Sequence, residues 1–110
     1  MLILITEKAN KEQILQASKD LDGYIKFVVD IDNGNLTIGG DRHYEGEQIL
    51  LKNGSQQTNL WGGGYDLSSK LKDYDSIVNI RPRDNNPSRE VLSIEIRKDI
   101  DNILKEKLGW

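Results

Sequence analysis

The sequence predicts an α+β fold, with a mostly antiparallel sheet of four to five strands and two or three helices packed on one face. Two patterns predict it. Residues 24–38 alternate between apolar and polar side chains on both sides of Asn33-Gly34, as in a β-hairpin. Residues 94–108 carry apolar side chains at helical spacing. A length of 110 residues fits one domain over residues 1–110.

The first strand and the first helix are predicted from short local signals. Leu2–Ile5 is an apolar run of strand length. Asn10 and Gln13 have the spacing of a capping box, which predicts a helix that begins after Asn10. The expected buried stripe of this helix is Ile14, Ala17 and Leu21. Gly23 can adopt the left-handed conformation that ends a helix.

The hairpin is the clearest element of the sequence. Residues 24–31 alternate, and Asn33-Gly34 favours a two-residue type I′ turn, which needs positive φ at both central positions. The pairs expected across that turn are Ile31 with Leu36 and Val29 with Ile38. All four side chains then lie on one face, so the turn and the pattern agree on the register. Gly39-Gly40 ends the second strand.

The middle of the chain allows two interpretations. A short helix over residues 45–53, ended by Gly54, is favoured. The alternative is a strand over residues 48–52 with Asn53-Gly54 as a second hairpin turn, for which the apolar residues match poorly. Residues 60–67 contain Trp61 and three consecutive glycines, and we expect an irregular strand or a loop there.

The last third is expected to hold a strand, a loop and a long helix. Residues 76–81 form the expected strand, which Pro82 closes. Within it, Asn79 and Arg81 would share one face, which would either open onto a pocket or be the solvated face of an edge strand. A turn-rich loop follows over residues 84–88. The final helix spans residues 94–108, with Ser93 as its N-cap.

Composition excludes several classes of site. The chain contains no cysteine, so disulfides, zinc ribbons and cysteine nucleophiles are excluded. A net charge of −3 disfavours general binding to nucleic acid. With neither a signal peptide nor an apolar run of membrane-spanning length, we expect a cytoplasmic protein. Residues 30–34 resemble the start of a calcium loop, but the glycine comes one position too early. We therefore expect no metal and no cofactor.

The arginines are the most informative residues for function. Of the five arginines, four lie in one short segment: Arg81, Arg83, Arg89 and Arg97. A guanidinium offers a planar fork of donors that matches carboxylates and phosphates, whereas lysine is a solvated point charge. The cluster therefore indicates either recognition of an anion or a set of ion pairs that fix a loop.

Two further residues have alternative interpretations. His43 is the only histidine, and it is either a general acid or base or a structural residue. Trp61 precedes Gly62, and it is either an aromatic platform on a mobile loop or an anchor in the core.

Several segments together resemble a family of short prokaryotic proteins catalogued as a domain of unknown function. They are Val28-Val29-Asp30-Ile31, Ile38-Gly39-Gly40, His43, Leu50-Leu51, Gly54-Ser55, Gln57, Leu60-Trp61-Gly62, Ile77-Val78-Asn79-Ile80-Arg81-Pro82, Asn86, Ser88 and Ile96-Arg97. The Asn-Ile-Arg-Pro and Leu-Trp-Gly segments are the most specific. The resemblance implies no activity. It implies a role for the residues that match the family pattern: His43, Trp61, Asn79, Arg81, Ser88 and Arg97.

These observations lead to one main functional hypothesis and two alternatives. We expect a pocket that binds an anionic group, phosphate or carboxylate, with Arg81 and Arg89 as the clamp, Asn79 orienting the anion and His43 as proton carrier. The other expected ligand-binding residues are Arg97, Trp61 and Ser88. The first alternative is a protein-interaction module or homodimer, with Trp110 as a contact. The second is binding of single-stranded nucleic acid through aromatic and arginine side chains. The sequence leaves open whether the protein is an enzyme.

Overall fold

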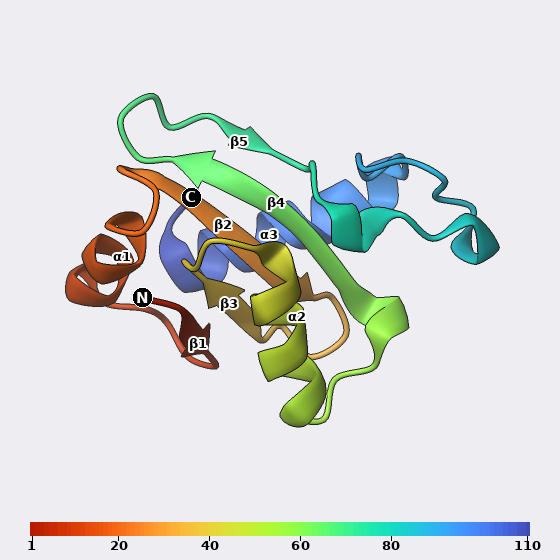
Figure 1. Cartoon of the computed structure of the whole chain (residues 1–110), viewed down its shortest axis with the longest axis horizontal. Helices are drawn as coiled ribbons and strands as arrows, with labels where there is room; N and C mark the ends of the chain where they lie inside the picture. The colour runs from red at the N-terminus through yellow and green to blue at the C-terminus, as the bar shows by residue number, and fades with distance from the viewer.

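Five strands form one antiparallel sheet in the order β1-β3-β2-β4-β5 (Figure 1). The computed structural model describes all residues, 1–110. The strands are β1 (Ile3–Ile5), β2 (Tyr24–Asp30), β3 (Leu36–Ile38), β4 (Leu60–Asp66) and β5 (Lys72–Asp73). The helices are α1 (Lys11–Ser18), α2 (His43–Lys52) and α3 (Ile94–Leu108). The α+β class is confirmed. No helix combines the length and the apolar character needed to cross a membrane.

Helices cover both faces of the sheet, so the expectation that all would pack on one face is wrong for α2. On one face, Phe27 and Val29 of β2 share a core with Ala17 of α1 and with Ile100 and Leu104 of α3. On the other face, the buried side chains in contact are Val28, Leu50 and Leu60. Figure 1 shows α2 in front of the sheet and α3 behind it. The physical reason is that β2 is apolar on both faces at its centre, which requires a cover on each side.

Capping residues determine where α1 begins and where α3 begins and ends. Asn10 Oδ1 accepts the Gln13 backbone N–H at 2.9 Å, and Gln13 Oε1 accepts the Asn10 N–H at 3.0 Å. The predicted capping box of α1 is therefore confirmed. Ser93 Oγ likewise accepts the Ile96 N–H at 3.2 Å and starts α3. Gly109, with φ of 76°, ends that helix in the left-handed conformation.

The hairpin forms, but its turn is longer than predicted. Val29 pairs with Leu36 and not with Ile38, a shift of two residues. The cause is Asp30, whose Oδ1 accepts the backbone N–H groups of Asp32 at 2.8 Å and Asn33 at 3.2 Å. This arrangement closes the loop over residues 31–34 before a type I′ turn can form. Because the shift is an even number of residues, the apolar side chains stay on the predicted face.

Residues 60–67 were expected to form an irregular strand or a loop; a strand is confirmed, but it is not irregular. β4 is a regular strand that pairs with β2 from Leu60 to Asp66. Its glycines serve close packing. A Cβ at Gly63 would collide with the Asp73 backbone and the Phe27 ring. Strand propensity is overridden here by tertiary contact. The predicted helix over residues 45–53 is confirmed as α2.

The predicted strand over residues 76–81 is also wrong. This segment forms a 3₁₀ turn, η2 (Ile77–Asn79), in which Ser76 Oγ accepts the Val78 N–H at 3.2 Å. A second turn, η3 (Pro82–Asp84), follows, and η1 (Gln57–Asn59) precedes β4. Asn79 and Arg81 therefore do not share a strand face. Both side chains reach the edge of β4 instead.

Candidate functional site

The outer edge of β4 is completed by side chains along much of its length. β5 pairs with β4 only at Gly64 and Tyr65. Nearer the start of the strand, Asn79 Oδ1 accepts the Gly62 N–H at 2.8 Å, and its Nδ2 donates to the Gly62 carbonyl at 2.9 Å. Arg81 Nη1 donates to the Leu60 carbonyl at 2.8 Å. Side chains from the segment after β5 thus form the hydrogen bonds with β4 that a neighbouring strand would otherwise form at Leu60 and Gly62.

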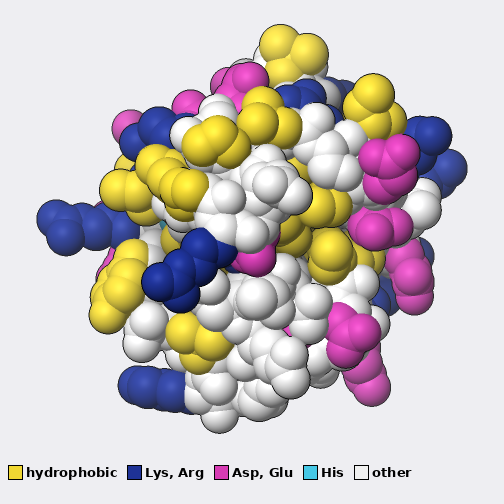
Figure 2. Space-filling view, turned by 90° about the vertical axis from the view of Figure 1, so that its right-hand side faces the viewer, with side chains coloured by type: hydrophobic (Ala, Val, Ile, Leu, Met, Phe, Trp, Pro, Cys, Tyr) yellow, Lys and Arg dark blue, Asp and Glu magenta, His cyan; other side chains and the backbone are white.

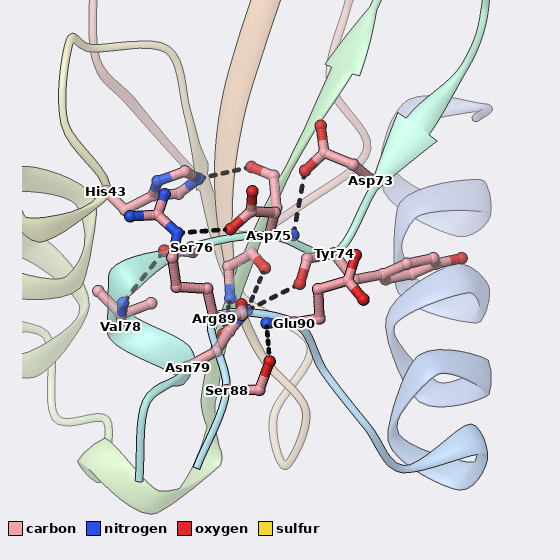
Figure 3. A network of polar contacts seen from close by, with 12 residues as sticks. His43, Asp73, Tyr74, Asp75, Ser76, Val78, Asn79, Ser88, Arg89 and Glu90 are labelled. Atoms are coloured by element: carbon pink, nitrogen blue, oxygen red, sulfur yellow. Dashed lines mark hydrogen bonds and ion pairs between the residues drawn. The ribbon is translucent and has the colours of Figure 1, made fainter. Parts of the chain in front are cut away.

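Asn79 is occupied by the protein itself. Its Nδ2 also donates to the backbone carbonyls of Tyr74 at 3.0 Å and Arg89 at 2.9 Å, and the residue is fully buried. Figure 3 shows its amide where these backbone segments meet. The structure therefore places Asn79, expected to orient a ligand, as a cross-link of the fold.

Asn86 has a similar role that the sequence analysis did not find. Its Nδ2 donates to the carbonyls of Asn79, Ser88 and Glu90 at 2.8, 3.0 and 2.9 Å. Ser88 Oγ accepts the Glu90 N–H at 3.0 Å. The only indication of a role for Asn86 in the sequence was that it matches the family pattern. Ser88 lies in this loop scaffold.

Arg81 is buried, and one edge of its guanidinium makes no hydrogen bond. The residue is 7% exposed. Nη1 donates to the carbonyls of Gln57 at 2.6 Å and Leu60 at 2.8 Å, and the guanidinium carbon lies 3.8 Å from the centre of the Trp61 ring. Neither Nε nor Nη2 has a hydrogen-bond partner. Burial lowers the pKa of Arg81 below its ordinary value, but an arginine keeps its charge in proteins.

A pocket of about 350 Å³ opens beside Arg81. It is lined by Gln57, Thr58, Arg81, Pro82, Arg83 and Asp84. Asp84 Oδ2 lies 3.5 Å from Arg81 Nε, which makes an ion pair but not a hydrogen bond. Arg83 is exposed. Figure 2 shows this end of the molecule, where basic and acidic side chains both stand out from the surface.

Glu47 is a buried neighbour of Gln57 and Arg81 that the sequence alone did not indicate. It is 9% exposed, and its Oε2 has no hydrogen-bond partner. Burial raises the pKa of its carboxyl, against the opposing effects of the Gln57 side chain and the Arg81 charge. The available signal was its position one helical turn before the buried Leu50, which places it on the inward stripe of α2.

His43 lies away from the pocket. It is 8% exposed, and its Nε2 lies 2.6 Å from the Gly63 carbonyl, so that nitrogen carries the hydrogen. Burial lowers the pKa of the imidazole, and this outweighs the hydrogen bond to Gly63, which acts to raise it. In Figure 3 the ring lies beside the Arg89 guanidinium. The histidine is therefore neutral at pH 7 and bonded to the sheet.

The other two predicted arginines hold the segment between β5 and α3. Arg89 Nε donates to Asp75 Oδ1 at 2.8 Å. Arg97 Nε donates to the Val91 carbonyl at 2.6 Å, and its guanidinium lies 4.5 Å from the centre of the Tyr74 ring. The arginine cluster is thus divided. Arg81 and Arg83 line the pocket, whereas Arg89 and Arg97 brace the chain.

Of the aromatic candidates, Trp61 is packed inside the protein and Trp110 is half-buried. Trp61 is 2% exposed and belongs to the core between the sheet and α3. Trp110 stacks on Tyr65 with ring centres 4.0 Å apart and an angle of 8° between the ring planes. Among the predicted site residues, the structure therefore brings together Arg81, which lines the pocket, and Trp61, which supports it.

A second hollow, of about 290 Å³, lies beside β1 and the start of α1. Its polar groups include Asn10 and Gln13, whose side chains already bond to each other's backbone in the capping box. No buried polar side chain without a partner lies there. No group of three or more His, Cys, Asp or Glu residues in the chain is placed to hold a metal ion.

Comparison with known proteins gives a family and no activity. The family model described as "Protein of unknown function (DUF5674)" matches residues 3–107. No curated protein and no solved structure matches the chain.

Proposed function

The chain belongs to the family DUF5674, whose function is unknown. From the geometry of the pocket we propose that the protein binds a small molecule through an anionic group, phosphate or carboxylate. The binding residues are Arg81 and Arg83, in the pocket beside the start of β4. The unpaired edge of the buried Arg81 guanidinium is the observation that carries the proposal.

That edge has the geometry that oxyanions require. Both carbonyl contacts of Arg81 use Nη1, which leaves Nε and Nη2 side by side. Two parallel N–H donors match two oxygens of a carboxylate or phosphate. Because the Trp61 ring lies against the guanidinium, the plane of the donors is fixed before a ligand arrives.

The energy of the unpaired edge favours an added anion. A buried donor without a partner costs about 1–3 kcal/mol, and charged groups cost more. Asp84, at 3.5 Å from Nε, compensates this only in part. Because both nitrogens are buried, a bound oxyanion would have to displace the groups that cover them, and it would then supply the missing acceptors. Arg83 would add a second positive charge.

Five residues of the sequence hypothesis lie outside the proposed site, because contacts within the protein occupy their side chains and they do not line the pocket: His43, Asn79, Ser88, Arg89 and Arg97. Arg89 donates to Asp75, so Arg83 takes its place as the second cation. His43 is bonded to Gly63 and does not line the pocket, so we propose binding without a proton carrier. We also assign the protein to the prokaryotic cytoplasm, in line with a chain that has no cysteine.

Thermal unfolding with and without inorganic phosphate or acetate tests the proposal. A ligand at a hundredfold excess over its Kd stabilises a folded protein by about 2.7 kcal/mol. For a domain of this size we expect a rise in Tm of roughly ten degrees or more. Arg83→Ala, which removes an exposed side chain, should weaken binding at least about tenfold. Arg81→Lys should do the same, because lysine lacks the fork.

Arg89→Ala is the matched control. It removes the same charge from an exposed ion pair outside the pocket, so both stability and anion binding should stay near wild type. The proposal is wrong if no anion raises the Tm, or if both Arg83→Ala and Arg81→Lys bind as wild type does.

A further inference from the structure

The acidic wall of the pocket indicates what the anion is attached to. Asp84 lines the same pocket as Arg81 and Arg83, and its side chain is 38% exposed. Its ion pair with Arg81 Nε, at 3.5 Å, is too long to be a hydrogen bond. The carboxylate therefore keeps acceptor capacity that faces the ligand space.

A bare anion can bind to Arg81 and Arg83, but the nearby Asp84 carboxylate weakens that binding. Two negative groups in one small pocket repel each other, and the repulsion is stronger near the protein than in bulk water. The pocket, at about 350 Å³, also lies in the size range of sites for whole small molecules, about 300–1,000 Å³. A ligand that placed hydroxyl groups on Asp84 would replace the repulsion with short charge-assisted O–H···O⁻ bonds.

Thr58 adds a second group that can bond to ligand hydroxyls. It is exposed, lines the pocket and follows Gln57, whose backbone carbonyl holds Arg81. Its hydroxyl can both donate and accept. The pocket thus presents two guanidinium groups for an anion and, next to them, a carboxylate and a hydroxyl for ligand O–H groups.

We infer that the ligand is a phosphorylated polyol of the sugar phosphate class. This inference rests on the proposed function. The phosphate lies on Arg81 and Arg83, whose two positive charges match a dianion. The hydroxyl groups of the ligand lie on Asp84 and Thr58. A sugar acid would offer the same hydroxyls with a single negative charge, and the experiment below separates the two.

Calorimetric titration tests the inference with four probes. Ribose 5-phosphate carries both features, butyl phosphate carries the phosphate alone, gluconate carries hydroxyls with a carboxylate, and inorganic phosphate is the bare anion. We expect wild type to bind ribose 5-phosphate at least about tenfold more tightly than butyl phosphate, the preference that one good hydrogen bond to a charged group provides.

Asp84→Asn identifies the group responsible. It removes the charge and keeps the size of an exposed side chain, so the fold should be retained. Ribose 5-phosphate should then bind about tenfold less tightly, while butyl phosphate should bind as well as before or better. Asp99→Asn, which neutralises an exposed residue of α3 outside the pocket, should change neither affinity.

Three results would overturn the inference. One is equal binding of ribose 5-phosphate and butyl phosphate, with Asp84→Asn strengthening both equally, since Asp84 would then only compete with the anion. Another is tighter binding of gluconate than of ribose 5-phosphate. In both cases the proposed anion site itself would stand. If no probe binds, the proposed function fails together with the inference.

Discussion

The Asn79 side chain pairs with the backbone of Gly62 as a neighbouring strand would, one amide engaging both the N–H and the carbonyl. The same Nδ2 reaches two further carbonyls, so one buried side chain joins β4 to two parts of the segment that follows β5. This relationship explains why the segment stays on the sheet without a strand of its own.

Truncation of this amide should destabilise the protein strongly. Asn79→Ala leaves several buried backbone groups without partners, each worth about 1–3 kcal/mol, so we expect a loss of at least about 3 kcal/mol. Urea unfolding measures it. Asn102→Ala, at an exposed position of α3, should stay within about 0.5 kcal/mol of wild type. A loss below about 1 kcal/mol in Asn79→Ala would contradict the bonding pattern.

His43 should make stability depend on pH. Its pKa is lowered in the folded protein, so the unfolded chain binds a proton first as the pH falls. The stabilising contribution is therefore complete above about pH 6.5, the ordinary histidine value, and decreases as the pH falls below it. Urea unfolding of wild type and His43→Gln at pH 7.5 and 5.5 isolates this effect. Wild type should lose more stability than the variant between the two values, and equal losses would argue against a buried neutral imidazole.

Glu47 should reduce the affinity for anions. Its buried carboxyl lies near Arg81 and offsets part of that charge. Glu47→Gln should therefore raise the affinity for sulfate at pH 7 by at least about twofold, or roughly 0.4 kcal/mol. Sulfate is the probe because its charge does not change near neutral pH. Glu45→Gln is the control on the same helix, since glutamine also suits its capping position. Unchanged or weaker sulfate binding in Glu47→Gln would count against this role.

Trp110 should contribute to stability through Tyr65. The stacked rings bury apolar surface, and such pairs are worth about 0.5–1.5 kcal/mol beyond that burial. Trp110→Ala should therefore lower the free energy of unfolding by at least about 1 kcal/mol, as measured by urea unfolding. Trp110→Phe keeps an aromatic partner and should recover part of the loss. Wild-type stability in Trp110→Ala would show that the stack contributes nothing.

Elements with local signals could be predicted from the sequence. The capping box at Asn10, the cap at Ser93 and the helical spacing of α3 act within a few residues, and the structure confirms them. The hairpin was found for the same reason. Its turn was not, because the Asp30 side chain competes with the Asn33-Gly34 turn for the backbone.

Elements that depend on distant contacts could not be predicted. The three glycines of β4 weaken a strand by propensity, and only its pairing with β2 and the close approach of Phe27 and Tyr24 explain them. The alternating pattern of residues 77–81 favours a strand, but Ser76 and the tertiary bonds of Asn79 select a 3₁₀ turn.

The candidate site was predictable only in part, for the same reason. Arg81 stood out beside its proline, and Arg83 lay in the same cluster. Nothing in the sequence showed that Arg89 would pair with Asp75 and Arg97 with the Val91 carbonyl, while Arg81 and Arg83 would line the pocket. Glu47 reaches the site from α2, on the other side of β4 in the sequence, so its contribution needed the fold.

The closed border of β4 also limits how molecules of this protein can aggregate. A strand with free N–H and C=O groups recruits strands from other chains. Here amide and guanidinium side chains cap those groups at Gly62 and Leu60, and β5 covers the rest of the strand. The edge strands left for strand addition are therefore short: the two residues of β5 at this border and the three residues of β1 at the other.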